Sequence, residues 1–180
     1  MDAIPGIMNK YPNVEFRFAG DDSIVDDIIG NTYKEKFLKD NRGARWLKQV
    51  KFLGKIDERE KEQEFANCDV FVSPSLYESF GIIFVEAMRY GKPVIGCRIG
   101  GMQEVIDENV TGLLAEPNDS ASFEACLAQL LDDAQMRIRM GDAGRSRMER
   151  MFTIDTMCNE CADIYRQIVL RGKKHYKGKN

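Results

Sequence analysis

The feature that most constrains this chain is the alternation of short β-branched or aromatic runs with segments of helical periodicity along most of its length. Such alternation is typical of a parallel sheet, because parallel strands need long crossover connections that are usually helices. We therefore predict an α/β fold with a parallel sheet, flanking helices and a helical carboxyl-terminal end. The predicted strands are Val14 to Ala19, Val50 to Leu53, Asp69 to Ser73, Pro93 to Cys97 and Thr111 to Ala115.

Segments with helical periodicity separate these strands, and only such segments follow the last strand. Gly91 and Pro93 end one helix, and Asp119 or Ser120 caps the first of the closing helices. The third strand is apolar enough to be buried on both faces. The predicted helices are Ile24 to Lys39 (irregular around Gly30), Glu58 to Ala66, Ile82 to Tyr90, Met102 to Asp107, Ser120 to about Asp132, Ala134 to Met151 and Ile154 to Leu170.

Length and charge exclude several classes of protein. The chain has 180 residues, of which 43% are apolar, enough for one compact core. Its 26 basic and 29 acidic side chains give a net charge of −3, so we predict no nucleic-acid partner. Residues 171–180 carry five bases and no acid. We predict one domain over residues 1–170 and a basic tail over 171–180, which is either solvated or in contact with a membrane surface or polyanion.

The sequence contains no apolar run long enough to span a membrane and no secretory signal in its first ten residues, so a cytoplasmic location is the default prediction. The five cysteines are irregularly spaced, which favours free thiols. Cys158 and Cys161 form a C-x-x-C motif on an apolar helical face, which favours core packing over a metal or redox site. The same packing is predicted for a group of methionines in the closing helices, Met136, Met140, Met148 and Met151.

One loop stands out among those that follow the strands, where open parallel sheets bind their ligands. It runs from Pro74 to Gly81 and carries Glu78, and a second carboxylate, Glu86, lies one turn into the next helix. The helix start offers free N–H groups to an anion, and Gly81 lets a ligand approach the backbone. A polyol joined to phosphate, such as a nucleotide sugar, would use both features. The spacing alone fits equally well with surface carboxylates at a helix start.

The remaining patterns leave alternatives open. Gly100 and Gly101 favour a simple turn over a space for a sugar, and Lys55 and Arg98 follow strand ends where they meet either phosphate or water. The single histidine, His175, lies in the basic tail, so no catalytic triad with histidine is predicted for the body. Phosphate-loop and dinucleotide glycine motifs are absent from the sequence, as is metal-loop spacing. We predict no metal and no cofactor.

At these residues the sequence resembles the carboxyl-terminal, donor-binding domain of the retaining glycosyltransferases of family 4, whose GT-B fold consists of two Rossmann-like domains. The resemblance extends loosely from about Tyr11 to Tyr165. The matching segments are Phe52 to Gly54, Asp69 to Ser75, Glu78 to Met88, Gly91 to Ile95, Gly100 to Gly101, Glu104 to Ile106, Thr111 to Leu114 and Pro117 to Asp119.

The resemblance implies transfer of a sugar from a UDP- or GDP-sugar to an acceptor hydroxyl, with retention of configuration and generally without a metal. It implies that Glu78 supports the reaction near the donor sugar and that Glu86 holds the ribose hydroxyls. Lys55 and Ile56 would lie along the base. The further substrate-binding residues are Ser79, Phe80, Gly81 and Ile82, which meet the diphosphate and sugar, together with Gly100 and Gly101.

The chain departs from the family pattern at its start. Members open this domain with a strand and a loop bearing an Arg and a Lys, whereas this chain begins in what resembles the following helix, Asp2 to Lys10. The missing strand would lie between those of Val14 and Asp69. We therefore expect a fragment, a truncated product or one part of a split or homo-oligomeric assembly, lacking the amino-terminal acceptor domain and inactive by itself. The alternative is a non-catalytic nucleotide-sugar binding or assembly module; a sugar-nucleotide epimerase is less favoured.

Overall fold

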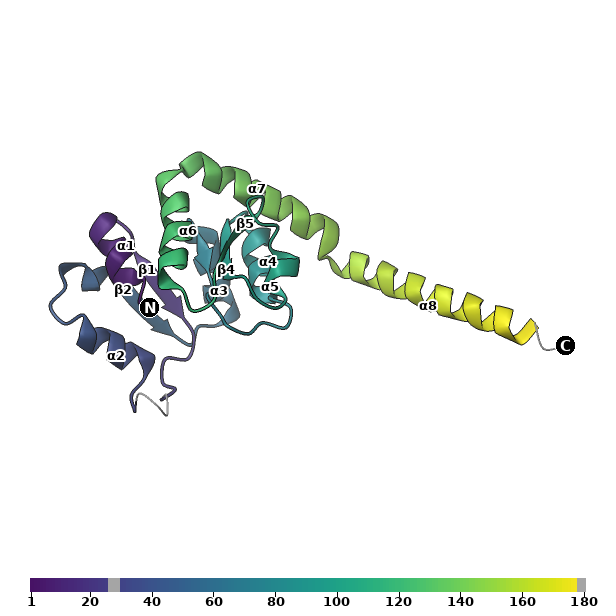
Figure 1. The fold of residues 1–180 in the computed structure, drawn as a ribbon, viewed down its shortest axis with the longest axis horizontal. Coiled ribbons are helices and arrows are strands. Elements are labelled where there is room, and N and C mark those ends of the chain that lie inside the picture. The colour runs from purple at the N-terminus through teal and green to yellow at the C-terminus, as the bar shows by residue number, and fades with distance from the viewer. Residues whose placement is uncertain (26–29, 178–180) are drawn as a thin grey trace.

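The structure is a computed structural model that describes residues 1–25 and 30–177, with side chains through residue 170. In this part of the chain the strands form two separate sheets, and every pairing between strands is parallel (Figure 1). β1 (Phe16–Ala19) pairs with β2 (Val50–Gly54). β4 (Val94–Cys97) lies between β3 (Phe71–Val72) and β5 (Gly112–Ala115). The predicted α/β fold with parallel strands and flanking helices is confirmed.

Helices cover both faces of the three-stranded sheet and bury β4 and β5 along their whole length. On one face α4 (Ile82–Arg89) and α5 (Met102–Val105) join a core cluster with Val94. On the other face α6 (Ser120–Asp132) packs against Ile95. The prediction of full burial for the third strand is wrong: β3 is only half-buried, because it is an edge strand of its sheet.

The remaining helices complete the order of elements. Most of the amino-terminal helices pack against the two-stranded sheet. Two long helices follow at the carboxyl-terminal end of the described chain. These elements are α1 (Ile4–Lys10), α2 (Tyr33–Asp40), the 3-10 helix η1 (Arg45–Gln49), α3 (Glu58–Asn67), α7 (Ala134–Met151) and α8 (Ile154–Lys177).

Reciprocal caps fix the starts of α2 and α3. In α3 the Asp57 carboxylate accepts from the backbone N–H of Glu60, whose side chain accepts from the Asp57 N–H. In α2 Thr32 and Glu35 are paired in the same way. The predicted start of this helix at residue 24 is therefore wrong. Its cap holds the start at residue 33; residues 26–29 of the predicted helix lie outside the described residues.

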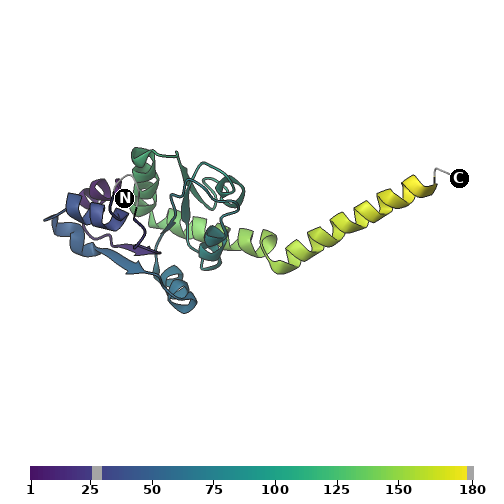
Figure 2. The same ribbon diagram turned by 90° about the horizontal axis from the view of Figure 1, so that it is seen from below.

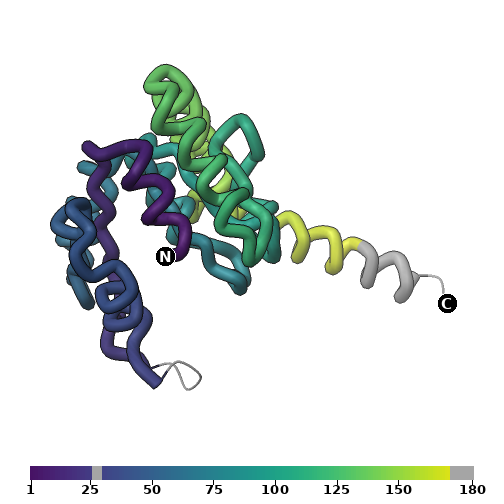
Figure 3. The backbone as a smooth tube through the Cα atoms, turned by 60° about the vertical axis from the view of Figure 1, so that its left-hand side comes forward, coloured from purple at the N-terminus to yellow at the C-terminus, as the bar shows by residue number. Residues whose placement is uncertain are grey.

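α1 joins the two sheets. Its Ile4 and Met8 pack in the cluster of the two-stranded sheet, whereas Ile7 packs with residues of β4, β5 and α6. Figure 3 shows α1 beside α6, and the Tyr11 hydroxyl donates to Asp132 at the end of α6 over 2.9 Å. No hydrogen-bonded ladder connects β1 with β3 among the described residues. The two sheets are thus held together by α1 and by side-chain contacts rather than by a continuous ladder.

α8 extends away from the rest of the molecule (Figures 1 and 2). The prediction that Cys158 and Cys161 are core residues is wrong, because both are exposed and their apolar face, with Ile154 76% exposed, is uncovered in the described chain. The helix continues to residue 177, past its predicted end, and the side chains of the predicted basic tail lie outside the described residues.

The predicted methionine packing holds for three of the four residues. Met140 is buried, and Met136 and Met148 are partly buried against the core clusters, whereas Met151 is 43% exposed where α7 ends. No helix in the described part of the chain is long and apolar enough to cross a membrane.

Candidate functional site

The loop that follows β3 leads directly into the start of α4. Gly81 occupies the N-cap position with φ of +88°, a conformation that favours glycine, and a Cβ there would lie 3.0 Å from the Phe84 ring. No side chain caps this helix, and its first turn holds no acidic residue. Free N–H groups and the positive end of the helix dipole are therefore presented at the carboxyl end of β3.

The Gly100–Gly101 turn, which follows β4, packs against the backbone of this loop. The Gly101 N–H donates to the Glu78 carbonyl over 3.1 Å. A Cβ on Gly101 would lie 2.6 Å from the Ser79 carbonyl oxygen and 2.7 Å from the Cα of Phe80. The two glycines thus form a turn that allows two loop backbones to touch. This contact brings Glu78 to Ile82 and Gly100 to Gly101 together at the carboxyl ends of β3 and β4.

Side chains around the loop remain accessible. Glu78 is half-buried, and Ser79 and Ile82 are exposed. The Phe80 ring meets Phe152, at the end of α7, edge-on with 5.8 Å between ring centroids. This aromatic contact anchors the loop to the helical end of the chain.

Glu86, on the second turn of α4, faces α3. Its Oε1 lies 3.0 Å from Lys61 Nζ, and the same ammonium lies 2.9 Å from Glu58 Oε1. The hydrogen bonds to Glu58 and then to Glu86 raise the pKa of Lys61. The second predicted carboxylate is therefore ion-paired. Sequence reasoning missed Lys61, which sits in a highly charged helix with only Glu58 three residues before it as a local signal.

Lys55 and Ile56 lie at the carboxyl end of β2. Lys55 is exposed and pairs with Asp21, which follows β1, over 2.9 Å. Hydrogen bonds from the Ser23 hydroxyl and then from Lys55 lower the pKa of Asp21 to about 2. Ile56 is half-buried. These two residues belong to the two-stranded sheet, and α3, which follows them, reaches the β3–α4 region through Lys61.

Arg98, which follows β4, is committed to acidic partners. Its Nε lies 2.8 Å from Glu116 Oε1, and its guanidinium is also paired with Glu108. These carboxylates raise the pKa of Arg98 further above its usual value. The sequence left phosphate or water as the partner of Lys55 and Arg98. In the structure both cations are paired with protein carboxylates, and the Lys55 side chain is also 77% exposed to solvent.

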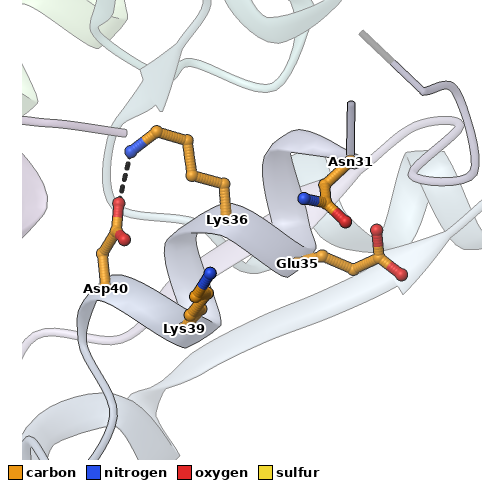
Figure 4. A pocket seen from close by; sticks show the side chains of 5 residues that line it. All are labelled: Asn31, Glu35, Lys36, Lys39 and Asp40. Atoms are coloured by element: carbon orange, nitrogen blue, oxygen red, sulfur yellow. Dashed lines mark hydrogen bonds and ion pairs between the residues drawn. The ribbon is translucent and has the colours of Figure 1, made fainter. Parts of the chain in front are cut away.

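A hollow of about 300 Å³ lies elsewhere, on α2, and is shown in Figure 4. Lys36 pairs with Asp40 across one turn of the helix at its edge. The hollow contains none of the predicted site residues. It is lined by Asn31, Glu35, Lys36, Lys39 and Asp40.

Comparison with known proteins decides the family. The family model described as "Glycosyl transferases group 1" matches residues 1–147. A D-inositol 3-phosphate glycosyltransferase of Corynebacterium kroppenstedtii is 32% identical over 170 residues, which are 94% of this chain and 37% of that protein. The chain belongs to the group 1 glycosyl transferases.

Solved structures place the chain within that family. It superimposes on the carboxyl-terminal domain of a group 1 glycosyl transferase, LpcC of Francisella tularensis, with a TM-score of 0.75 and 26% identity over 85% of this chain and 77% of that one. The HepE protein of Anabaena, solved in complex with UDP-glucose, matches with a TM-score of 0.76 and 24% identity over 92% of this chain and 43% of that one. The predicted resemblance to the carboxyl-terminal GT-B domain is confirmed.

The chain is shorter than its relatives. It spans 37% of the length of the first curated proteins that it matches.

Proposed function

We propose that this chain is the donor-binding half of a retaining glycosyltransferase that moves a sugar from a UDP- or GDP-sugar to an acceptor hydroxyl. The observation that carries the proposal is the packing of the Gly100–Gly101 turn on the Glu78 loop beside the uncapped start of α4. This arrangement puts a carboxylate and free N–H groups at one edge of the sheet. A sugar joined to a diphosphate needs both.

In this proposal the diphosphate rests on the N–H groups of Ser79 to Ile82, where the α4 dipole favours negative charge. Glu78 lies beside the donor sugar, where its carboxylate stabilises the positive charge that develops as the glycosidic bond breaks. Lys55 and Ile56 line the base. Glu86 accepts hydrogen bonds from the ribose hydroxyls. Metal ions and cofactors have no role in the proposed chemistry.

We also propose that the donor site is completed by polypeptide outside this chain. Lys55 and Arg98, the two cations at the strand ends, are ion-paired, which leaves the diphosphate charge to be balanced elsewhere. The edges of β1 and β3 lack a ladder between them in the described residues, and the relatives are longer. A further parallel strand between β1 and β3, with its own basic loop, would supply both. The 180-residue chain alone should then bind donor weakly and turn none over.

Isothermal calorimetry with UDP-glucose and GDP-mannose tests the binding proposal. We expect measurable binding of one donor by the chain, and loss of at least tenfold in affinity on Glu78→Ala or Glu86→Ala. The matched control is Glu149→Ala, which removes an exposed carboxylate on α7. Equal affinities for all four proteins would refute the assigned site.

The second candidate function is a non-catalytic nucleotide-sugar binding or assembly module. The pairing of Lys55 and Arg98 with carboxylates favours it, because catalytic donor sites need the leaving diphosphate neutralised. Adding the amino-terminal domain of a group 1 relative and measuring release of UDP separates the two. Sugar transfer in the combined proteins supports the transferase, and tight donor binding without transfer supports the module.

A further inference from the structure

The Lys61–Glu86 ion pair connects the candidate site to α3. The two side chains come from different helices and meet over 3.0 Å, and they are only 27% and 32% exposed. Glu58, one turn earlier on α3, lies 2.9 Å from the same ammonium. Lys61 therefore sits between two carboxylates, one of its own helix and one of α4.

Aromatic packing fixes the register of this pair. Phe65, four residues after Lys61, is buried and stacks on Tyr90, four residues after Glu86, with 6.0 Å between ring centroids. Phe65 also meets Phe71 of β3 at 5.3 Å. Because residues four apart share a face of a helix, α3 and α4 present the ion pair and the aromatic pair as successive rungs of the same contact.

The ion pair with Lys61 restricts the orientation of the Glu86 side chain. A glutamate side chain has several rotamers, and ordering it costs free energy each time a ligand binds. Lys61 holds Oε1 in place beforehand, and a carboxylate has lone pairs left on both oxygens for further donors. The ammonium also offsets the charge of Glu86 where the anionic diphosphate would approach.

We propose that Lys61 is a positioning residue, which holds the Glu86 carboxylate in the orientation that accepts hydrogen bonds from the ribose hydroxyls of the donor. This inference rests on the proposed function. Two residues on different helices would then make the chain prefer nucleotides with both ribose hydroxyls. Glu86 contacts the hydroxyls, and Lys61 holds Glu86 in position before the nucleotide binds. Arginine at this position would preserve the role, and an uncharged side chain would not.

The test compares UDP with 2′,3′-dideoxy-UDP by calorimetry on the 180-residue chain. We expect the native chain to prefer UDP by about tenfold or more, the equivalent of one good hydrogen bond to a charged group. Lys61→Met should remove most of this preference while leaving the weak binding of dideoxy-UDP unchanged. Lys61→Arg should retain the preference. The matched control is Lys36→Met, which breaks the lysine–aspartate pair on α2 outside the site.

A double-mutant cycle distinguishes positioning from a structural role. In the Glu86→Gln background, Lys61→Met should cause no further loss, because the lysine acts through that carboxylate. Preference for UDP that survives Lys61→Met overturns this inference and leaves the proposed function standing. Equal losses from Lys61→Met in both backgrounds also overturn it. Where GDP is the nucleotide that binds, the same comparison uses GDP and 2′,3′-dideoxy-GDP. Binding of neither UDP nor GDP by the native chain overturns the proposed function and this inference with it.

Discussion

The two sheets of this domain differ in how deeply their strands are buried. In the three-stranded sheet, β4 and β5 are buried along their length between helices on both faces. In the two-stranded sheet, β1 alternates between half-buried and exposed residues, and a pair of strands is marginal without further packing. α1 and an aromatic cluster of Phe18, Phe37 and Phe52 provide that packing.

This difference divides the candidate site. The Glu78 loop and the Gly100–Gly101 turn rest on the fully covered sheet, where close backbone packing sets their positions. Lys55 and Ile56 rest on the thinner sheet, joined to the first through α1 and the Lys61–Glu86 pair. The loops to which we assign the phosphate and sugar are thus held by backbone contacts to each other, whereas the residues to which we assign the base depend on how the two sheets are held together.

The largest expected effect is on stability. Leu113→Ala in β5 removes a side chain that is 3% exposed and should lower the free energy of unfolding by about 2–5 kcal/mol, because it leaves a cavity in a packed core. Leu47→Ala in η1, which is only half-buried against the thinner sheet, should cost about half as much. Urea denaturation measures both. Equal losses would remove the distinction between the two sheets.

The next effect is on the site itself. Gly101→Ala forces a Cβ to within 2.6 Å of the Ser79 carbonyl oxygen, so the two loops must separate and donor affinity should fall by at least tenfold. Gly6→Ala is the matched control, because the three atoms nearest to its Cβ all belong to the far end of the flexible Glu124 side chain rather than to backbone. Calorimetry with UDP-glucose compares them. An unchanged affinity in Gly101→Ala would mean that the loop contact does not shape the site.

The smallest effect is a pH dependence shared by both sheets. Hydrogen bonds from Arg17 and Arg98 lower the pKa values of Glu64 and Glu108 below the usual 4.5. Their contribution to stability is therefore complete above pH 4.5 and is lost as the pH falls through the lowered values. Glu64→Gln or Glu108→Gln should each cost about 1 kcal/mol or less at pH 7, since these pairs lie near the surface.

Urea midpoints at pH 7 and pH 3 check this prediction. The native chain should lose slightly more stability between the two pH values than either glutamine variant. A larger acid loss in the variants would contradict the assigned ion pairs.

Local patterns predicted much of the fold. Neighbouring residues alone determine the apolar runs of β4 and β5 and the cap of α6 at Asp119. The positions of these features could therefore be predicted to within two residues. α2 was misplaced because the sequence around Gly30 permits a helix, whereas the Thr32–Glu35 box starts it later. The exposure of Cys158 was not predictable, since periodicity shows an apolar face but not what covers it.

The candidate site was predicted as a set of residues without their partners. Glu78, Glu86 and the glycine turn could be chosen from their places after strands. The pairing of Glu86 with Lys61 spans 25 residues, and that of Arg98 with Glu116 spans 18, so both depend on tertiary packing. Sequence could therefore suggest cations that meet phosphate or water where the structure has ion pairs.

The most direct test of the account is an amide NMR titration of the 180-residue chain with UDP-glucose and, separately, with GDP-mannose. We predict that the chemical shifts of Ile82 and Gly101 move together and saturate, while those of Lys36 and Lys39 at the α2 hollow remain unchanged. Shifts confined to the α2 hollow, or none at Ile82 and Gly101 at saturating donor, would contradict the claim that the packed loops after β3 and β4 form the donor site.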